Sequence, residues 1–540
     1  MKRLTRHGKL AGTLVAAMTM TMAIGLAVAP GAPAGAVPGG TAAAPPLQCV
    51  DNGTSGHRVQ VLYTYEPGTS RFAEREASIR AAAWVAQQNV NDSARRDGAQ
   101  RWIRFLTGST GCQLTIDQVQ VPTGTASSDT LLNVLRPLGY DADNRLYVIL
   151  SENHRVNCAG TVDEGIADPT APGTGNQRNS RTVWITFQPS CFTGHTMTHE
   201  LAHGLGGLQP EAPNHSGGGH CSDGNETLCQ NDNPTVCTDP LAVRLLDCGS
   251  DDYFGINPQG SYLPTHFNAA HHSLYLQAGS AVPTMATIPA LPPQLLRATD
   301  VEGSSVVLSF LPSVKPVGSG YAVDHQVLRN GTVVATVPGW RTSVRLTGLA
   351  TNTTATYTVR QRVTHAGVTR TSVASQPLTV TTNSSTAPAG AAENGATMIL
   401  ANDVLDGSGA NLTIDVLGFS EDENATVIQW PQNGEANQQW KMTSATGGTW
   451  TLTNNHSLKC LTPLGGATTA GTPVVQATCS GAAAQRWSFT LLSGVTYHIK
   501  TASNLCVRAA GGSTGALTAL ELATCSATDP TQRWSTNRTA

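Results

Sequence analysis

Two histidines and a glutamate stand close together near the middle of this chain of 540 residues. His199 and His203 are four residues apart, and Glu200 directly follows the first histidine. Residues four apart lie on one face of a helix, so both imidazoles could reach one metal ion at roughly 2.0–2.1 Å, the usual Zn–N distance. Glu200 would lie beside them, where it could accept a proton from a water that the ion polarises. The pattern therefore predicts a Zn²⁺ site with its own general base.

The flanking residues predict how this motif is positioned. Residues 183–187 form an apolar run of strand length, and a helix is expected to begin near Thr193 or Gly194. Gly204 and Gly206 can end this helix and turn the chain back toward the metal. Further upstream, residues 59–65 and 146–150 are expected strands, and the apolar residues between 72 and 90 recur at helical intervals.

This motif and its glycines resemble the metzincin zinc proteases, whose pattern continues to a third metal ligand and then to a turn that contains methionine. The resemblance implies a zinc-dependent endopeptidase that acts on a protein or peptide substrate. The chain departs from the pattern in one respect, because Gln209 stands where the family has its third ligand.

The third ligand is therefore expected in the glycine-rich segment 213–223. If the spacing of the matrix-metalloprotease-like members is counted onward from His220, the methionine position falls on Leu228 and the tyrosine position of many members on Gln230. We favour His220 as the third ligand. His215, Asp223 and Gln209 remain alternatives.

A second stretch, within 248–268, resembles the tail of a group of secreted, predicted metzincin-type proteases from high-GC Gram-positive bacteria. A structural role is expected for this stretch. His266, His271 and His272 are accordingly expected to pack or to face solvent rather than to bind metal.

The N-terminus has the layout of a secretory signal peptide, because basic residues precede an apolar stretch at 10–29 and small residues follow, with cleavage expected after Ala36. The chain has 12 cysteines, eight before residue 288 and four after residue 385, and disulfides are expected in an exported protein because both totals are even. A formal charge of −3 with 13% charged residues provides no electrostatic attraction to nucleic acid. After cleavage, no segment is expected to cross a membrane.

Composition divides the chain into several parts. We predict a signal peptide at 1–36, an α+β metzincin-like domain at 49–287, a β-sandwich at 288–383, a linker at 384–394 and a β-trefoil at 395–540. In the sandwich, Asn330-Gly331 between two Val-rich runs predicts a hairpin. Leu349 and Tyr357 there resemble the tyrosine corner of fibronectin type III domains, which implies a spacer.

An internal repeat marks the last part. Trp440, Trp487 and Trp534 follow one another at equal intervals, and a glutamine precedes each by two positions. Three equal units predict a threefold fold. The Gln-x-Trp triplets resemble ricin-type β-trefoil lectin modules, and this resemblance implies disulfides Cys460–Cys479 and Cys506–Cys525 within the second and third units.

The lectin resemblance also implies which units bind sugar. The first unit has the full set for a carbohydrate pocket: an aspartate, an aromatic platform and two polar residues, namely Asp415, Trp430, Asn437 and Gln438. The aspartate and platform positions hold Thr462 and Ala477 in the second unit, and Arg508 and Ala523 in the third. We expect those two pockets not to bind sugar. Gln438 is as readily explained by support of the core.

The sequence thus predicts a secreted, monomeric zinc endopeptidase joined to a carbohydrate-binding module. One alternative is a secreted lectin whose metalloprotease domain has become inactive, which Gln209, Leu228 and Gln230 favour. Another is a zinc hydrolase that acts on a glycan or on a peptidoglycan peptide.

Overall fold

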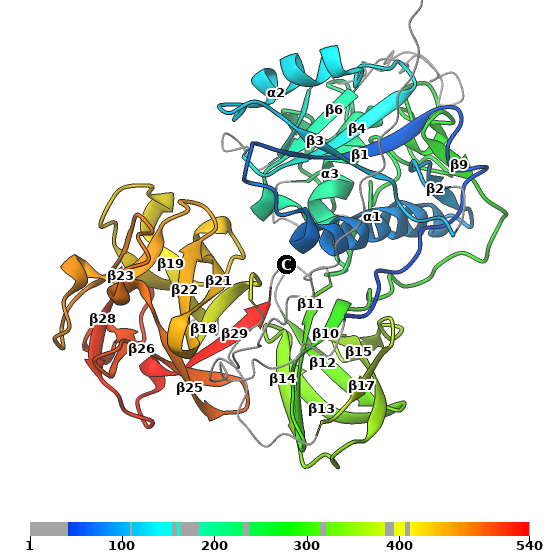
Figure 1. The fold of residues 1–540 in the computed structure, drawn as a ribbon. Coiled ribbons are helices and arrows are strands. Elements are labelled where there is room, and N and C mark those ends of the chain that lie inside the picture. Colours follow the sequence, from blue (N-terminus) through cyan, green and yellow to red (C-terminus); the bar gives the residue numbers. More distant parts are fainter. Residues whose placement is uncertain are drawn as a thin grey trace, which may run out of the picture. The chain divides into compact units, whose positions relative to one another are not determined.

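The computed structural model describes residues 41–108, 111–153, 159–162, 183–229, 237–313, 320–383, 394–405 and 411–538, and Figure 1 shows their fold. The predicted signal peptide, Gln230 and nearly all of the predicted linker lie outside these residues. Within the described ranges, no helix is long and apolar enough to span a membrane. The three regions that follow are each described by themselves.

A five-stranded sheet of order β3-β1-β4-β6-β5 organises the N-terminal region. Four of its strands are parallel, and the edge strand β5 runs antiparallel to β6. The strands are β1 (Arg58–Tyr65), β3 (Ile116–Gln120), β4 (Arg145–Ser151), β5 (Ala159–Val162) and β6 (Val183–Phe187). The three strands expected from the sequence are therefore confirmed. Their continuous apolar runs fit a sheet that is covered on both faces.

Helices cover this sheet. The apolar side chains of α1 (Phe72–Arg95) and α3 (Gly194–Gly204) share one core cluster with Val61 of β1, while α2 (Ser128–Leu135) shares another with Leu62. Successive residues of β1 thus point to opposite faces, as expected of a strand. Smaller pairings complete the region: β2 (Arg101–Ile103) with β9 (Leu276–Ala278), and β7 (His215–Gly217) with β8 (His220–Cys221).

The middle region has two antiparallel sheets around one apolar core, to which Leu308 and Val359 contribute from different sheets. The first sheet contains β10 (Gln294–Val301), β11 (Ser305–Leu311) and β14 (Ser343–Thr347). The second contains β12 (Tyr321–Arg329), β13 (Thr332–Pro338), β15 (Thr354–His365), β16 (Val368–Thr371) and β17 (Leu378–Thr381). The predicted hairpin is confirmed: Asn330 and Gly331 join β12 to β13 with φ of 49° and 83°, as a type I′ turn requires.

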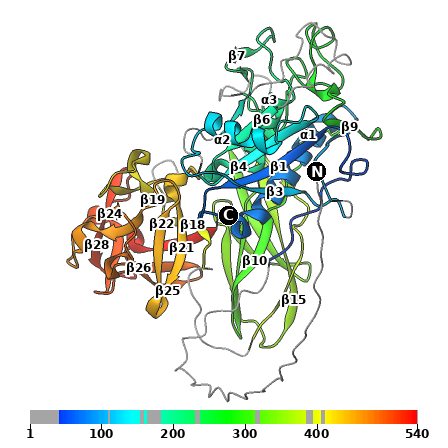
Figure 2. The ribbon, with the colours of Figure 1, turned by 45° about the horizontal axis from the view of Figure 1, so that its top comes forward.

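The C-terminal region, coloured yellow to red in Figures 1 and 2, contains a threefold repeat of short strands. Trp440, Trp487 and Trp534 are fully buried in one core, and each indole Nε1–H donates to a backbone carbonyl at 3.0 Å. The acceptors are the carbonyls of Ile414, Leu461 and Val507, which lie 26, 26 and 27 residues before their tryptophans, so the three units repeat the same bond. The disulfides Cys460–Cys479 and Cys506–Cys525 are confirmed.

The strands of this trefoil are β18 (Thr397–Leu405), β19 (Asn411–Val416), β20 (Val427–Pro431), β21 (Gln439–Ala445), β22 (Thr449–Asn454), β23 (Cys460–Pro463), β24 (Val474–Ala477), β25 (Ser488–Ser493), β26 (Thr496–Lys500), β27 (Leu505–Ala509), β28 (Thr518–Thr524) and β29 (Trp534–Arg538).

Candidate metal and carbohydrate sites

Helix α3 places the two motif histidines side by side. Thr193 caps the helix by accepting the Thr196 N–H at 3.1 Å, and the helix begins where the sequence predicts. The imidazole centroids of His199 and His203 are 4.9 Å apart. After the helix, Gly206 adopts a φ of 91°, and the chain turns there, as the sequence predicts from Gly204 and Gly206.

His220 approaches the same position from the strand β8. The Nε2 atoms of His199 and His220 are 3.2 Å apart, and the His220 ring centroid is 5.2 Å from that of each motif histidine. The preceding glycines make this approach possible. A Cβ at Gly219, whose φ is 77°, would lie only 3.0 Å from Cε1 of His203. The structure therefore brings the three predicted histidines together.

Two backbone carbonyls orient the motif imidazoles. Nδ1 of His199 lies 2.6 Å from the Thr227 carbonyl, and Nδ1 of His203 lies 3.2 Å from the Gly207 carbonyl. Because a carbonyl can only accept, each Nδ1 carries a hydrogen, which leaves the Nε2 lone pairs for a ligand. Burial lowers the pKa of all three histidines, that of His203 to about 3, and so keeps them neutral. Three neutral imidazoles with separations of this size fit the donor set of a tetrahedral zinc site.

Glu200 is buried next to the histidines and has a partner from the edge of the sheet. The Thr161 hydroxyl, on β5, donates to Glu200 Oε2 at 2.9 Å. This contact joins residues 39 positions apart in the chain, so it could not be predicted from the local sequence.

The alternative ligands have other positions or partners. His215 lies on β7, where its backbone pairs with Cys221, and its side chain is not in the group of potential ligands around His199. Gln209 donates its Nε2–H to the Gly206 carbonyl at 2.6 Å. The Asp223 carboxylate belongs to a different group, with Asp251 and Asp252. Among the described residues, the group of potential ligands that includes His199 contains only His203 and His220 in addition.

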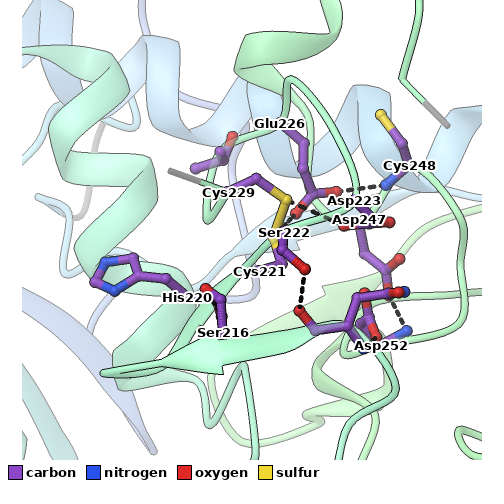
Figure 3. Close-up of a disulfide and its surroundings, with 12 residues drawn as sticks. Ser216, His220, Cys221, Ser222, Asp223, Glu226, Cys229, Asp247, Cys248 and Asp252 are labelled. Atoms are coloured by element: carbon purple, nitrogen blue, oxygen red, sulfur yellow. Dashed lines mark hydrogen bonds between the residues drawn. A yellow bond between two sulfur atoms is a disulfide. The ribbon is translucent and has the colours of Figure 1, made fainter. Parts of the chain in front are cut away.

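Buried acids and disulfides hold the loop that carries Thr227. Figure 3 shows Glu226 and Asp247 beside the disulfide Cys221–Cys229. Asp247 Oδ2 accepts the backbone N–H groups of residues 252–254, and Glu226 accepts the Tyr253 hydroxyl at 2.8 Å. Burial raises the pKa of Glu226 well above its ordinary value and that of Asp247 to about 7. Buried hydrogen bonds thus hold residues 252–254 of the stretch 248–268, and His272 is fully buried.

Leu228 lies next to Thr227 and is fully buried in the core cluster of the N-terminal region. It thus occupies a packed position beside the carbonyl that orients His199.

In the trefoil, the structure brings together the polar residues predicted for the first unit. Asp415 Oδ1 accepts from Asn437 Nδ2 at 2.8 Å, and Oδ2 accepts from Gln438 Nε2 at 3.0 Å. Trp430, half-buried, stands two residues after Ile428, the partner of Asp415 across the β19–β20 ladder. Asn437 Oδ1 is buried and accepts no hydrogen bond from the described part of the chain. Burial raises the pKa of Asp415 to about 6.

Gln438 also has a role that all three units share. Its Oε1 accepts a loop N–H from Asn433, and its Nε2 donates to the Pro431 carbonyl. Gln485 and Gln532 make the same two kinds of bond in their own units. Gln438 therefore supports the turn, and its further bond to Asp415 is special to the first unit.

The second and third units differ at the pocket itself. Thr462 faces Val475 across the β23–β24 ladder, so this unit has no carboxylate there. In the third unit, Arg508 Nε donates to Glu521 Oε1 at 2.9 Å, and this ion pair occupies the position of Asp415. That these two pockets do not bind sugar remains a prediction.

Comparison with known proteins identifies the C-terminal region. Residues 404–534 match the ricin-type beta-trefoil lectin domain family, so this region is a ricin-type β-trefoil lectin domain. The comparison with curated proteins finds no match.

Three solved structures resemble about a quarter of the chain. The designed threefold-symmetric protein ThreeFoil is 27% identical, with 26% of this chain and 97% of that chain covered and a TM-score of 0.24. The ricin B-like lectin of Macrolepiota procera, in complex with lactose, is 23% identical, with 27% and 97% covered and a TM-score of 0.22. The agglutinin of Rhizoctonia solani is 19% identical, with 28% and 99% covered and a TM-score of 0.24.

Proposed function

We propose that this protein is a secreted, zinc-dependent endopeptidase whose ricin-type lectin domain binds carbohydrate through its first repeat. The observation that carries the peptidase part is the convergence of His199, His203 and His220 beside Glu200. The lectin family match and the Asp415–Asn437–Gln438 network support the carbohydrate part. The described disulfides agree with an extracellular protein.

The residues of the first site have distinct roles in this proposal. His199, His203 and His220 would hold zinc through Nε2, and zinc in that position would supply a Lewis acid for the scissile carbonyl. Glu200 takes the proton of the attacking water and then delivers it to the leaving amine. The Thr161 hydroxyl holds the Glu200 carboxylate in place. The carbonyls of Thr227 and Gly207 keep the imidazoles in the correct tautomer.

The metzincin and fibronectin type III relations are part of this proposal. The strand, helix and strand that precede helix α3, namely β1, α1 and β4, support the first, and the two-sheet sandwich with buried Tyr357 supports the second. In this proposal the sandwich is a spacer.

A second candidate function is a lectin with an inactive metalloprotease domain. Gln209 favours it, because this side chain donates to the Gly206 carbonyl where metzincins have a ligand. Casein zymography of the mature protein, with and without a zinc chelator, separates the two candidates. Chelator-sensitive clearing supports the peptidase, and one bound zinc without clearing supports the inactive domain.

The third ligand can be tested by comparing two histidines of one hairpin. His220→Ala is expected to lower zinc affinity by more than the ~10–100-fold that loss of an outer partner costs, because it removes one of three donors. His215→Ala, the matched control, is expected to keep one zinc per chain. Zinc content after dialysis, measured by mass spectrometry, provides the comparison. Loss of zinc from His215→Ala alone would reassign the ligand.

Sugar binding is expected to weaken below a pH of about 6. Protonation of Asp415, whose pKa burial raises to about 6, removes a carboxylate oxygen that accepts sugar hydroxyls, so Kd should rise about tenfold for each further pH unit. Because the pKa of Asp415 is raised in the folded state, protonated Asp415 contributes to the stability of the fold at low pH, and this contribution is lost as the pH rises through 6. Protonation of Asp415 therefore does not unfold the domain in acid. Calorimetric titration at pH 7.5 and 5.0 measures the change, and thermal unfolding at both pH values detects any general loss of structure. An unchanged Kd would contradict the assignment of Asp415.

A further inference from the structure

An exposed phenylalanine stands in the turn that follows the Asp415 strand. Residues Leu417–Phe419 form a 3-10 turn directly after β19. The Phe419 side chain is 43% exposed, although large apolar side chains are usually buried. Its φ is 54°, in the left-handed region that side chains other than glycine rarely adopt.

The other two repeats have glycine at this position. The equivalent turns are Leu464–Gly466 and Ala510–Gly512, and the third residue of each has a positive φ, 69° at Gly466 and 72° at Gly512. The turn itself therefore requires a left-handed residue, which glycine supplies at no steric cost. Only the repeat with Asp415, Trp430 and Asn437 has an aromatic residue there. Phe419 therefore departs from the residue type that this turn favours in the other two repeats.

Contacts with His456 hold Phe419 in place. The His456 ring meets it edge to face, with centroids 5.3 Å apart and planes at 90°. His456 Nε2–H also donates to the Phe419 carbonyl at 3.0 Å. The ring thus combines solvent exposure with a fixed orientation, and a fixed ring loses little conformational entropy when a ligand binds.

Hydrogen bonds join this turn to the predicted sugar pocket from two directions. Asn437 Nδ2 donates to Asp415 Oδ1 and also to the carbonyl of Val416, the residue before the turn. On the other side, the His456 N–H donates to Asn454 Oδ1, and Asn454 Nδ2 donates to the Asn437 carbonyl. Phe419 is therefore tied to the pocket both through its own strand and through His456.

We propose that Phe419 is a second aromatic platform beside the Asp415–Trp430 pocket, so that the first repeat binds an oligosaccharide of at least two linked sugar rings in preference to a monosaccharide. An aromatic face offers the apolar face of a sugar ring a large, rigid contact area. One ring occupies the pocket and the next one packs on Phe419. This inference rests on the proposed carbohydrate binding.

The test compares sugars of different length on the full mature chain. An array of immobilised galactose, N-acetylgalactosamine, mannose and xylose, with disaccharides and trisaccharides that end in each, selects the best-bound series. Calorimetry with the monosaccharide and disaccharide of that series follows. The wild-type chain is expected to bind the disaccharide about tenfold more tightly than the monosaccharide.

Four variants locate the source of this preference. Phe419→Ala should lose the tenfold increment and keep the affinity for the monosaccharide, whereas Phe419→Tyr should keep both. Phe419→Gly is the variant that is sure to suit the turn, because the other repeats have glycine there, and it should behave like Phe419→Ala. Leu464→Ala, in the equivalent turn of the second repeat, is the matched control and should change nothing.

The outcomes separate this inference from the proposed function. If Phe419→Gly binds the disaccharide as tightly as wild type does, or if wild type shows no preference for length, the second platform is wrong while sugar binding stands. If the wild-type chain binds no sugar on the array, the proposed carbohydrate binding fails, and the second platform fails with it.

Discussion

A chain with Glu200→Gln is expected to keep one zinc ion and to lose nearly all hydrolysis of peptide bonds, by about 10²–10⁴-fold in kcat. The amide has the shape of the carboxylate and can still accept the Thr161 hydroxyl, so the helix and the three histidines should stay in place. It cannot take up a proton from water, which is the role we assign to Glu200. Cleavage of a quenched fluorescent peptide library measures the rate, and mass spectrometry measures zinc.

Glu211→Gln is the matched control for this experiment. Glu211 is an exposed glutamate shortly after the same helix, and its replacement changes the net charge by the same amount. It should leave the rate unchanged. Full proteolysis by Glu200→Gln would refute the assignment of the general base, whereas loss of zinc from Glu200→Gln would show that the substitution disturbs the histidines instead.

Asp415→Ala is expected to weaken sugar binding by the full-length chain about 10- to 100-fold. A hydrogen bond to a charged group contributes about 1.5–3 kcal/mol, and the substitution removes the carboxylate that would accept the sugar hydroxyls. It also leaves the Nδ2–H of Asn437 without one of its acceptors, which disturbs the rest of the pocket. Calorimetry or surface plasmon resonance with the best sugar from an array measures the loss.

Thr462→Ala, at the equivalent position of the second repeat, is the control for Asp415→Ala. Thr462 faces Val475 and has no carboxylate, so its replacement should leave Kd unchanged. If Thr462→Ala weakens binding and Asp415→Ala does not, the active pocket lies in another repeat and our reading of the first unit is wrong.

Local patterns in the sequence predicted much of the architecture. The equal spacing of Trp440, Trp487 and Trp534 predicted a threefold domain with the tryptophans in a shared core, and the structure has it. The resemblance of the Gln-x-Trp triplets to ricin-type lectin modules predicted the two disulfides Cys460–Cys479 and Cys506–Cys525. Asn330-Gly331 predicted a hairpin because few other dipeptides accept a positive φ at both positions.

Other features lay beyond what the sequence could indicate. The pairing of Cys49 with Cys112 joins segments 63 residues apart, and eight cysteines in the first region allowed too many pairings to assign. The ion pair between Arg508 and Glu521 could not be predicted either, because it depends on which residues face each other across the β27–β28 ladder.

The two halves of the candidate metal site illustrate the difference. The spacing of His199, Glu200 and His203 placed them on one turn of a helix, since a helix repeats over a few neighbouring residues and its faces can be counted along the chain. His220, the carbonyl of Thr227 and the hydroxyl of Thr161 reach that turn from a glycine-rich hairpin, a disulfide-bonded loop and the edge of a sheet. Contacts between such distant segments depend on how whole elements pack, so the folded chain alone reveals which side chains surround the helix.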